Sequence, residues 1–240
     1  MLRKLFDSLL AVAYPQVCRS CGNSVECAAD GVACGECWKA SEIFSGAETL
    51  CAKCGAFQQA KPSDYETFCH RCDEHFYDAA SAVGIYGHAL TASIIHLKSE
   101  PFAAARLREL FAARFESSGF QNVELIVPVP LSKKRRMERG FNQAAVLSKN
   151  LAGQTKINLD EQSLVRELHT PMHRVGMDGK ARAASVKNAF AVKRPKLIAG
   201  KTILLVDDVF TSGATVSNCA ETLKQNGAEK VYVLTLAKTL

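Results

Sequence analysis

Short apolar runs alternate with longer amphipathic stretches from about residue 79 to the end of the chain. Continuous apolar runs are typical of strands buried on both faces, and apolar positions that recur every three to four residues are typical of helices. Strands are expected at 82–86, 125–127, 202–206 and 230–236, and helices at 89–98, 103–116, 142–151 and 215–225. Strands that alternate with helices predict an α/β domain with a parallel sheet, which we place at residues 77–240.

The first 76 residues have a different composition, because nine of the ten cysteines lie before residue 73. Eight of them form four pairs with two residues between the cysteines: Cys18/Cys21, Cys34/Cys37, Cys51/Cys54 and Cys69/Cys72. This spacing lets both sulfurs of a tight turn face one tetrahedral metal ion, so eight thiolates suffice for two Zn²⁺ ions. We therefore predict a small N-terminal domain at residues 1–76, held by two structural zinc ions rather than by a large apolar core.

A disulfide framework is the alternative use of these cysteines. It requires a secretory route, but Asp7 interrupts the N-terminal apolar stretch, and Tyr14-Pro15 stands where a signal peptide would have a small-residue cleavage site. The odd number of cysteines before residue 73, with Cys27 left over, also favours zinc.

Two groupings of the four pairs are compatible with the spacing. Sequential ribbons, in which the first two pairs share one zinc ion and the last two share the other, keep each loop short and are favoured. A cross-braced arrangement stays open. We assign no role to Cys27 and Cys219, and we expect His70 and His75, close to the last pair, to be bystanders.

The chain is mildly basic, with a net charge of +6 and an isoelectric point near 8.8, which permits anionic partners. No apolar run approaches the roughly 18 residues of a membrane span, so we expect no stable membrane insertion and a cytoplasmic location. Residues 1–13 fit an amphipathic helix that packs on the rest of the protein, with docking to a membrane surface or a partner as the alternative.

The strongest candidate for a ligand site is residues 203–215, an apolar run followed by two carboxylates, a turn of small residues and a helix start. Backbone N–H groups at the helix start, with the hydroxyls of Thr211, Ser212 and Thr215, form a cradle for an anion. Asp207 and Asp208 lie just before it and suit vicinal hydroxyls or Mg²⁺. The pattern predicts a sugar-phosphate site, and the alternative is a solvent-exposed strand end before a capped helix. A Walker A loop is not supported, because Gly-x4-Gly-Lys is absent here.

A second candidate stretch is strongly basic and follows the strand expected at 125–127. Five cations lie within seven residues: Lys133, Lys134, Arg135, Arg136 and Arg139. The carboxyl edge of a parallel sheet is where ligands bind in α/β folds. Cations at that edge suit a pyrophosphate group or a nucleic-acid backbone. The alternative is a solvated basic loop.

Residues 203–215 resemble the loop that binds 5-phosphoribosyl 1-pyrophosphate (PRPP) in type I phosphoribosyltransferases. The resemblance implies that Asp207 and Asp208 face the ribose 2′- and 3′-hydroxyls and that Mg²⁺ accompanies PRPP. It implies that the 5′-phosphate is wrapped by Thr211, Ser212, Gly213, Ala214 and Thr215, and that the basic stretch takes the place of the pyrophosphate loop. In a transferase the candidate catalytic residues are Asp207, Asp208, Arg135 and Arg139, because cations there neutralise the leaving pyrophosphate.

The order of motifs along nearly the whole chain resembles the ComF family of competence proteins. The motifs that match are the four cysteine pairs, Pro128-Val129-Pro130, residues 139–143, the acidic loop at 206–215 and the shorter stretches 96–98 and 187–190. The family implies a type I phosphoribosyltransferase-like parallel sheet with helices on both faces, preceded by a zinc-ribbon domain. We place Lys98 among the ligand-binding residues on the same basis.

One region departs from the family pattern. Arg174 and Ser185 stand where the family often has Gln and Asn, and its Arg-rich run is thinned to Lys180-Ala181-Arg182. This region is expected to form a hood over the ligand, so the preference for a base or a partner does not follow from the resemblance.

The ComF resemblance links the chain to DNA uptake in natural transformation, with single-stranded DNA and a helicase as implied partners. Three functions are compatible with it: a transferase that moves phosphoribose while pyrophosphate leaves, a sensor that binds PRPP without chemistry, and a DNA-handling module. The intact loop favours retained PRPP binding. No acceptor-specific residue is recognisable, so the sequence does not establish turnover.

Overall fold

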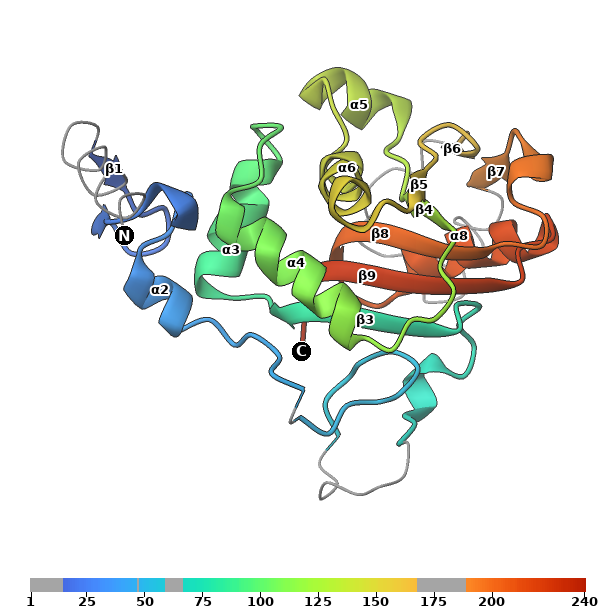
Figure 1. Cartoon of the computed structure of the whole chain (residues 1–240), viewed down its shortest axis with the longest axis horizontal. Coiled ribbons are helices and arrows are strands. Elements are labelled where there is room, and N and C mark those ends of the chain that lie inside the picture. Colours follow the sequence, from blue (N-terminus) through green and yellow to red (C-terminus); the bar gives the residue numbers. More distant parts are fainter. Residues whose placement is uncertain (1–14, 47, 59–66, 168–188) are drawn as a thin grey trace, which may run out of the picture.

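A five-stranded parallel sheet forms the centre of the molecule in the computed structural model, which describes residues 15–46, 48–58, 67–167 and 189–240 (Figure 1). The strand order is β3-β9-β8-β4-β5, and all four pairings are parallel. The strands are β3 (Ala79–Ile85), β4 (Leu125–Pro128), β5 (Asn158–Leu159), β8 (Thr202–Phe210) and β9 (Lys230–Lys238). The expected parallel α/β sheet is therefore confirmed.

Helices cover both faces of this sheet (Figure 1). One face carries α3 (His88–Leu97), α4 (Ala105–Ser117) and α6 (Gln143–Thr155), and the other carries α8 (Ala214–Gln225). Side chains alternate between faces along a strand, so Leu204 and Val206 pack under α3, α4 and α6, while Ile203 and Leu205 pack under α8. Burial on both faces explains why the central strands read as continuous apolar runs.

Further elements lie outside the central sheet. The basic stretch forms a short helix, α5 (Lys133–Arg139), where the sequence predicted no element. It begins because Ser132 Oγ accepts a hydrogen bond from Arg135 N (3.3 Å), and it ends at Gly140, whose φ of 76° suits glycine. β6 (Leu164–Arg166) and β7 (Phe190–Val192) pair antiparallel, and we call them the β6–β7 hairpin; β7 packs against α8.

The residues of the expected hood, Arg174, Lys180, Arg182 and Ser185, lie outside the described residues, as does the N-terminal helix expected at 1–13. Within the part of the chain that the structure describes, no helix is long and apolar enough to cross a membrane.

The cysteine-rich segment contributes to the main core instead of standing apart from it. Its elements are β1 (Gln16–Val17), β2 (Ser24–Val25), α2 (Gly35–Lys39) and the 3-10 helices η1 (Ala28–Asp30) and η2 (His70–Cys72). Cys18, Cys34, Cys37 and Trp38 join the core of the α3 and α4 face, whereas Cys51, Cys54, Cys72 and Tyr77 join that of the α8 face. Val25, Trp38 and Phe44 pack with residues of the sheet and its helices, so the segment shares the main core in addition to its two groups of thiols.

The chain passes from one face of the sheet to the other around edge strand β3. Phe44 N donates to Val83 O and Ile85 N donates to Glu42 O, each at 2.9 Å. Gly84 permits this crossing, since a Cβ at that position would lie 2.2 Å from Glu42 O. The two cysteine clusters therefore lie on opposite faces of one sheet. A domain boundary between residues 76 and 77 stays a prediction.

Candidate functional site

The acidic loop lies at the carboxyl end of central strand β8. The strand continues past both carboxylates to Phe210, because β9 pairs with it as far as Phe210↔Lys238. Gly213 then adopts a left-handed φ of 77° and α8 begins at Ala214. The first N–H groups of a helix lack intrahelical partners, and Thr211, Ser212, Ala214 and Thr215 are exposed around them. The loop thus offers amides and hydroxyls to an anion.

The two carboxylates have different surroundings. Asp208 Oδ2 lies 3.5 Å from Lys98 Nζ, so the lysine after α3 reaches the end of β8. Burial, followed by the charge of Asp208, raises the pKa of Asp207 well above its usual value. Two adjacent carboxylates that resist ionising together are suited to a cation or to ligand hydroxyls, which stabilise the ionised form.

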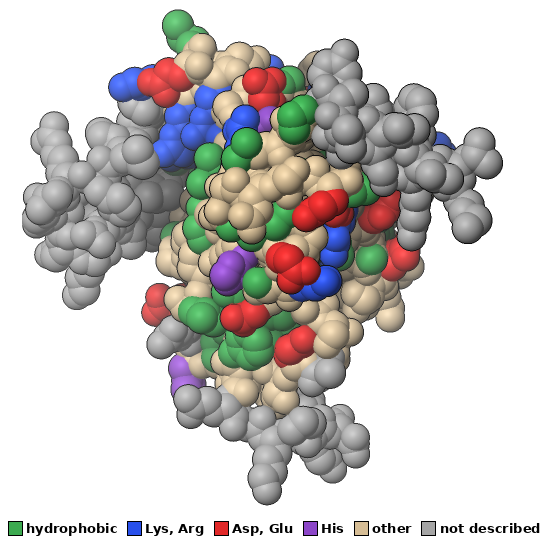
Figure 2. All heavy atoms as spheres, turned by 90° about the vertical axis from the view of Figure 1, so that its left-hand side faces the viewer, with side chains coloured by type: hydrophobic (Ala, Val, Ile, Leu, Met, Phe, Trp, Pro, Cys, Tyr) green, Lys and Arg blue, Asp and Glu red, His purple; other side chains and the backbone are tan. Residues whose placement is uncertain are grey.

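Helix α5 lies at the same edge as the acidic loop. β4 is the direct neighbour of β8, and Val129 N donates to Val206 O (2.8 Å) just before α5 begins. Asn142 Nδ2 donates to Val129 O (3.0 Å), which ties the start of α6 to the end of β4. In Figure 2 Lys and Arg side chains gather near the top of the molecule, at the height of α5 in Figure 1. Helix α5 therefore follows the strand next to β8, at the edge of the sheet where the acidic loop lies.

Arg166, at the end of β6, is a site residue that the sequence analysis missed. Burial and the nearby charge of Arg135 lower its pKa, whereas Asp207 opposes that change. Its guanidinium lies 5.4 Å from the centre of the Phe190 ring on β7. The charge of Arg166 therefore interacts with those of both Arg135 and Asp207. A lone arginine at the end of a three-residue strand gave no signal in the sequence.

The eight paired cysteines form two groups of four thiols, with the sulfurs of each group within 4.8 Å of one another. The groups are Cys18, Cys21, Cys34 and Cys37, which we call the first tetrad, and Cys51, Cys54, Cys69 and Cys72, the second tetrad. The sequential grouping is therefore the one found. Sulfur pairs lie 3.4–3.7 Å apart, close to the ~3.8 Å that tetrahedral Zn–S bonds of about 2.3 Å impose.

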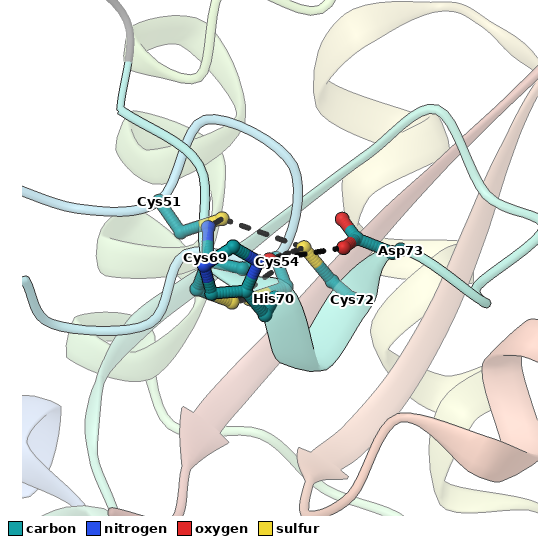
Figure 3. Close-up of polar contacts among 6 residues, drawn as sticks. All are labelled: Cys51, Cys54, Cys69, His70, Cys72 and Asp73. Carbon is teal, nitrogen blue, oxygen red and sulfur yellow. Dashed lines mark hydrogen bonds and ion pairs between the residues drawn. The ribbon is translucent and has the colours of Figure 1, made fainter.

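In each tetrad backbone N–H groups favour the thiolate of one cysteine, whereas burial and the neighbouring thiols raise the pKa of others, such as Cys37 to about 12 and Cys54 to about 11. Burial favours the neutral thiol of Cys18, but backbone N–H groups of Cys34, Cys21 and Ser20 stabilise the thiolate and lower its pKa to about 6. Cys51 receives the same support from Cys69 N at 3.3 Å, and its pKa falls to about 7. Figure 3 shows the second tetrad, beside which His70 pairs with Asp73 at 3.8 Å. Four thiolates leave no open position, which suits a structural zinc site.

Comparison with known proteins places these features in a family. A model of the phosphoribosyl transferase domain matches residues 98–239. DNA utilization protein YhgH of Salmonella typhimurium is 36% identical over 203 residues, covering 80% of this chain and 85% of the relative. Competence protein F of Haemophilus influenzae is 30% identical over 230 residues, covering 92% of this chain and 96% of the relative. The chain belongs to the ComF family. Competence protein ComFC of Bacillus subtilis is 31% identical over 121 residues, covering 48% of this chain and 45% of the relative.

The structure of this ComF-family chain brings several predicted site residues to one edge. Lys98, Asp207 and Asp208 meet at the end of β8, beside the loop at 211–215 and helix α5. Their roles toward PRPP, Mg²⁺ and pyrophosphate, including those of Arg135 and Arg139, stay predictions.

Zinc content tests the two tetrads. The purified ComF-family protein is expected to carry two zinc ions per chain, and Cys37→Ser or Cys72→Ser to lower the content to about one, since three thiolates bind zinc less tightly. Cys27→Ser, outside both tetrads, is the matched control and should keep two. Elemental analysis provides the measurement. Absence of zinc, or disulfides intact under native conditions, would contradict the assignment.

The raised pKa of Asp207 has a consequence for stability. Because the folded chain holds this proton more tightly than the unfolded chain, the free energy of unfolding falls as pH rises from the ordinary pKa of 3.8 through the folded value. Asp207→Asn should therefore unfold at higher urea concentration than wild type at pH 7, with a difference that shrinks toward pH 4. Exposed Asp73→Asn is the control. If Asp207→Asn is less stable than wild type at pH 7, the ionised Asp207 carboxylate stabilises the folded chain, which would contradict the prediction.

Proposed function

We propose that this ComF-family chain binds PRPP with Mg²⁺ at the carboxyl end of β8 and takes part in DNA uptake. The observation that carries the proposal is the meeting of two carboxylates, an exposed hydroxyl-rich loop at a helix start, and the cations of α5 at one edge of the sheet. An anion cradle beside paired carboxylates and further cations matches a sugar that bears a phosphate at one end and a pyrophosphate at the other.

The parts of the ligand correspond to parts of this edge. The 5′-phosphate is assigned to residues 211–215, whose amides and hydroxyls donate hydrogen bonds to it. The ribose hydroxyls are assigned to Asp207 and Asp208. The pyrophosphate is assigned to Arg135 and Arg139, with Lys98 beside Asp208. Mg²⁺, when bound, supplies further positive charge to the pyrophosphate.

In a transferase these residues act mainly through charge. Positive groups fixed beside the pyrophosphate stabilise its departure, while the carboxylates at the ribose favour the positive charge that develops on the sugar. A panel of bases offered with PRPP, with pyrophosphate release as the readout, separates a transferase from a sensor that binds PRPP without chemistry.

The names of the relatives support the cellular part of the proposal. Proteins named for competence and for DNA utilization match most of this chain. A role in DNA uptake further implies a cytoplasmic location and a competence helicase as a partner, and both follow from the family resemblance.

PRPP binding is tested by calorimetry with PRPP and Mg²⁺. Asp208→Ala and Thr215→Ala should each weaken binding about 10- to 100-fold, since each removes a hydrogen bond to a charged or hydroxyl-rich part of the ligand. Thr222→Ala, which changes a threonine of the same helix away from the loop, is the matched control. Unaltered affinity in both site variants would refute the site.

Single-stranded DNA is a second candidate ligand, favoured by the exposed cations Lys133, Lys134 and Arg136 on α5. Its affinity should fall with salt, with a slope of about −2 to −3 in log K against log salt if three or four cations engage phosphates. Because α5 also borders the proposed pyrophosphate site, PRPP and DNA should compete. Fluorescence anisotropy over a salt series provides the measurement. A salt-independent affinity would show that the contact is not electrostatic, and simultaneous binding of both ligands would place the DNA elsewhere.

A further inference from the structure

The segment that follows the second tetrad lies directly against residues 211–215, which we call the phosphate loop. His75 N donates to Cys72 O (3.1 Å), and Phe76 N donates to Ser217 Oγ (3.1 Å) in the first turn of α8. A Cβ placed on Gly213 would lie 3.1 Å from His75 Nε2 and 2.7 Å from Phe210 Cζ. His75, three positions after Cys72, therefore leaves no room for a side chain on Gly213 at the centre of the loop.

Stacked aromatic rings extend this contact to the end of β8. His75 stacks on Tyr77 with ring centres 5.1 Å apart, and Tyr77 meets Phe210 edge-on at 6.0 Å. Tyr77 is 1% exposed, so this arrangement is enclosed by protein. Phe210 is the last residue of β8 and comes immediately before the loop. The loop is thus supported both at its start and at its centre.

The Cys51/Cys54 turn of the second tetrad contacts the end of β9, which in turn contacts Phe210 at the end of β8. Lys238 Nζ, at the end of β9, donates to Cys54 O (2.9 Å) and lies 3.8 Å from the centre of the Phe210 ring. Ala80 N donates to Lys53 O (2.7 Å), which fixes the first turn of the tetrad on β3. Both cysteine turns of the second tetrad therefore contact elements that hold the loop.

The first tetrad has different neighbours. Its segment is joined to α4 by the ion pair of Arg106 with Asp30 (2.9 Å) and to α3 by Ala89 N, which donates to Ser41 Oγ (3.1 Å). These contacts lie on the opposite face of the sheet from α8. The two tetrads are similar in ligand chemistry but differ in their relation to the loop, which makes the first a control for the second.

We propose that the second tetrad, through His75, Phe76 and Tyr77, positions the phosphate loop. A closed zinc site fixes the chain on both sides of residue 72, and the rigid segment after it holds Gly213 and Ser217 in place. Loss of metal from the second tetrad then loosens residues 211–217 and weakens ligand binding, whereas loss from the first tetrad leaves the loop as it is. The statement about ligand affinity rests on the proposed function, and the statement about loop order does not.

The experiment compares matched cysteine variants of the full chain without any ligand. Amide hydrogen exchange in a peptide that covers residues 208–218 should speed up about ten-fold in Cys72→Ser, while Cys37→Ser stays within about two-fold of wild type. Zinc analysis of the same samples checks that each variant has lost one ion. Calorimetry with PRPP and Mg²⁺ should then show about ten-fold weaker binding for Cys72→Ser alone.

Two further pairs of variants keep all eight cysteines, so they apply even if Cys72→Ser does not fold. Ser217→Ala removes the acceptor for Phe76 N and should speed up exchange in the loop, while Ser217→Thr keeps a hydroxyl and should restore protection. His75→Ala should act as Ser217→Ala does, whereas His70→Ala, at an exposed position beside the same tetrad, should not. All four are expected to retain two zinc ions per chain.

The proposal is overturned if amide hydrogen exchange in residues 208–218 stays at the wild-type rate in Ser217→Ala and His75→Ala. It is also overturned if Cys37→Ser and Cys72→Ser speed up that exchange equally. If wild type does not bind PRPP, the proposed function fails, and the exchange rates still decide whether the tetrad positions the loop.

Discussion

Two adjacent carboxylates at the end of a buried central strand are the feature around which this structure is arranged. Ionised groups are unfavourable where protein displaces water unless partners stabilise them. Lys98 approaches Asp208 from α3, and Arg166 approaches Asp207 from the β6–β7 hairpin. The raised pKa of Asp207 shows that this compensation is incomplete. A bound cation, or a ligand whose hydroxyls donate hydrogen bonds to the carboxylates, would stabilise the ionised form of this pair.

Much of the fold could be predicted because burial on both faces leaves a strong pattern in the sequence. The runs around Leu204 and Leu234 identify the two central strands, and the helix expected at 215–225 begins within one residue of α8. The extension of β8 to Phe210 could not be read in the same way, because it depends on pairing with Lys238 in a distant strand. Helix α5 was missed because its residues are nearly all charged and lack an apolar repeat.

The candidate site was predicted where neighbours in sequence form it, and missed where distant segments meet. Residues 207–215 are contiguous, and cysteine spacing indicated both tetrads. Arg166 gave no signal, and we expected His75 to be a bystander of the last cysteine pair. Their places near Asp207 and Gly213 arise only when the hairpin and the second tetrad pack on the sheet. Cysteine spacing also does not reveal that the two tetrads are buried on opposite faces of the sheet. It follows from the crossing at Gly84, which lets one cysteine-rich segment reach both sides of the sheet.

A crystal structure of the full chain with PRPP and Mg²⁺ tests the central claim most directly. The account predicts that the 5′-phosphate lies on the amides of residues 211–215, that the ribose hydroxyls face Asp207 and Asp208, and that the pyrophosphate lies toward α5. A ligand bound elsewhere, or a ligand at this edge with its pyrophosphate on residues 211–215, would contradict the account.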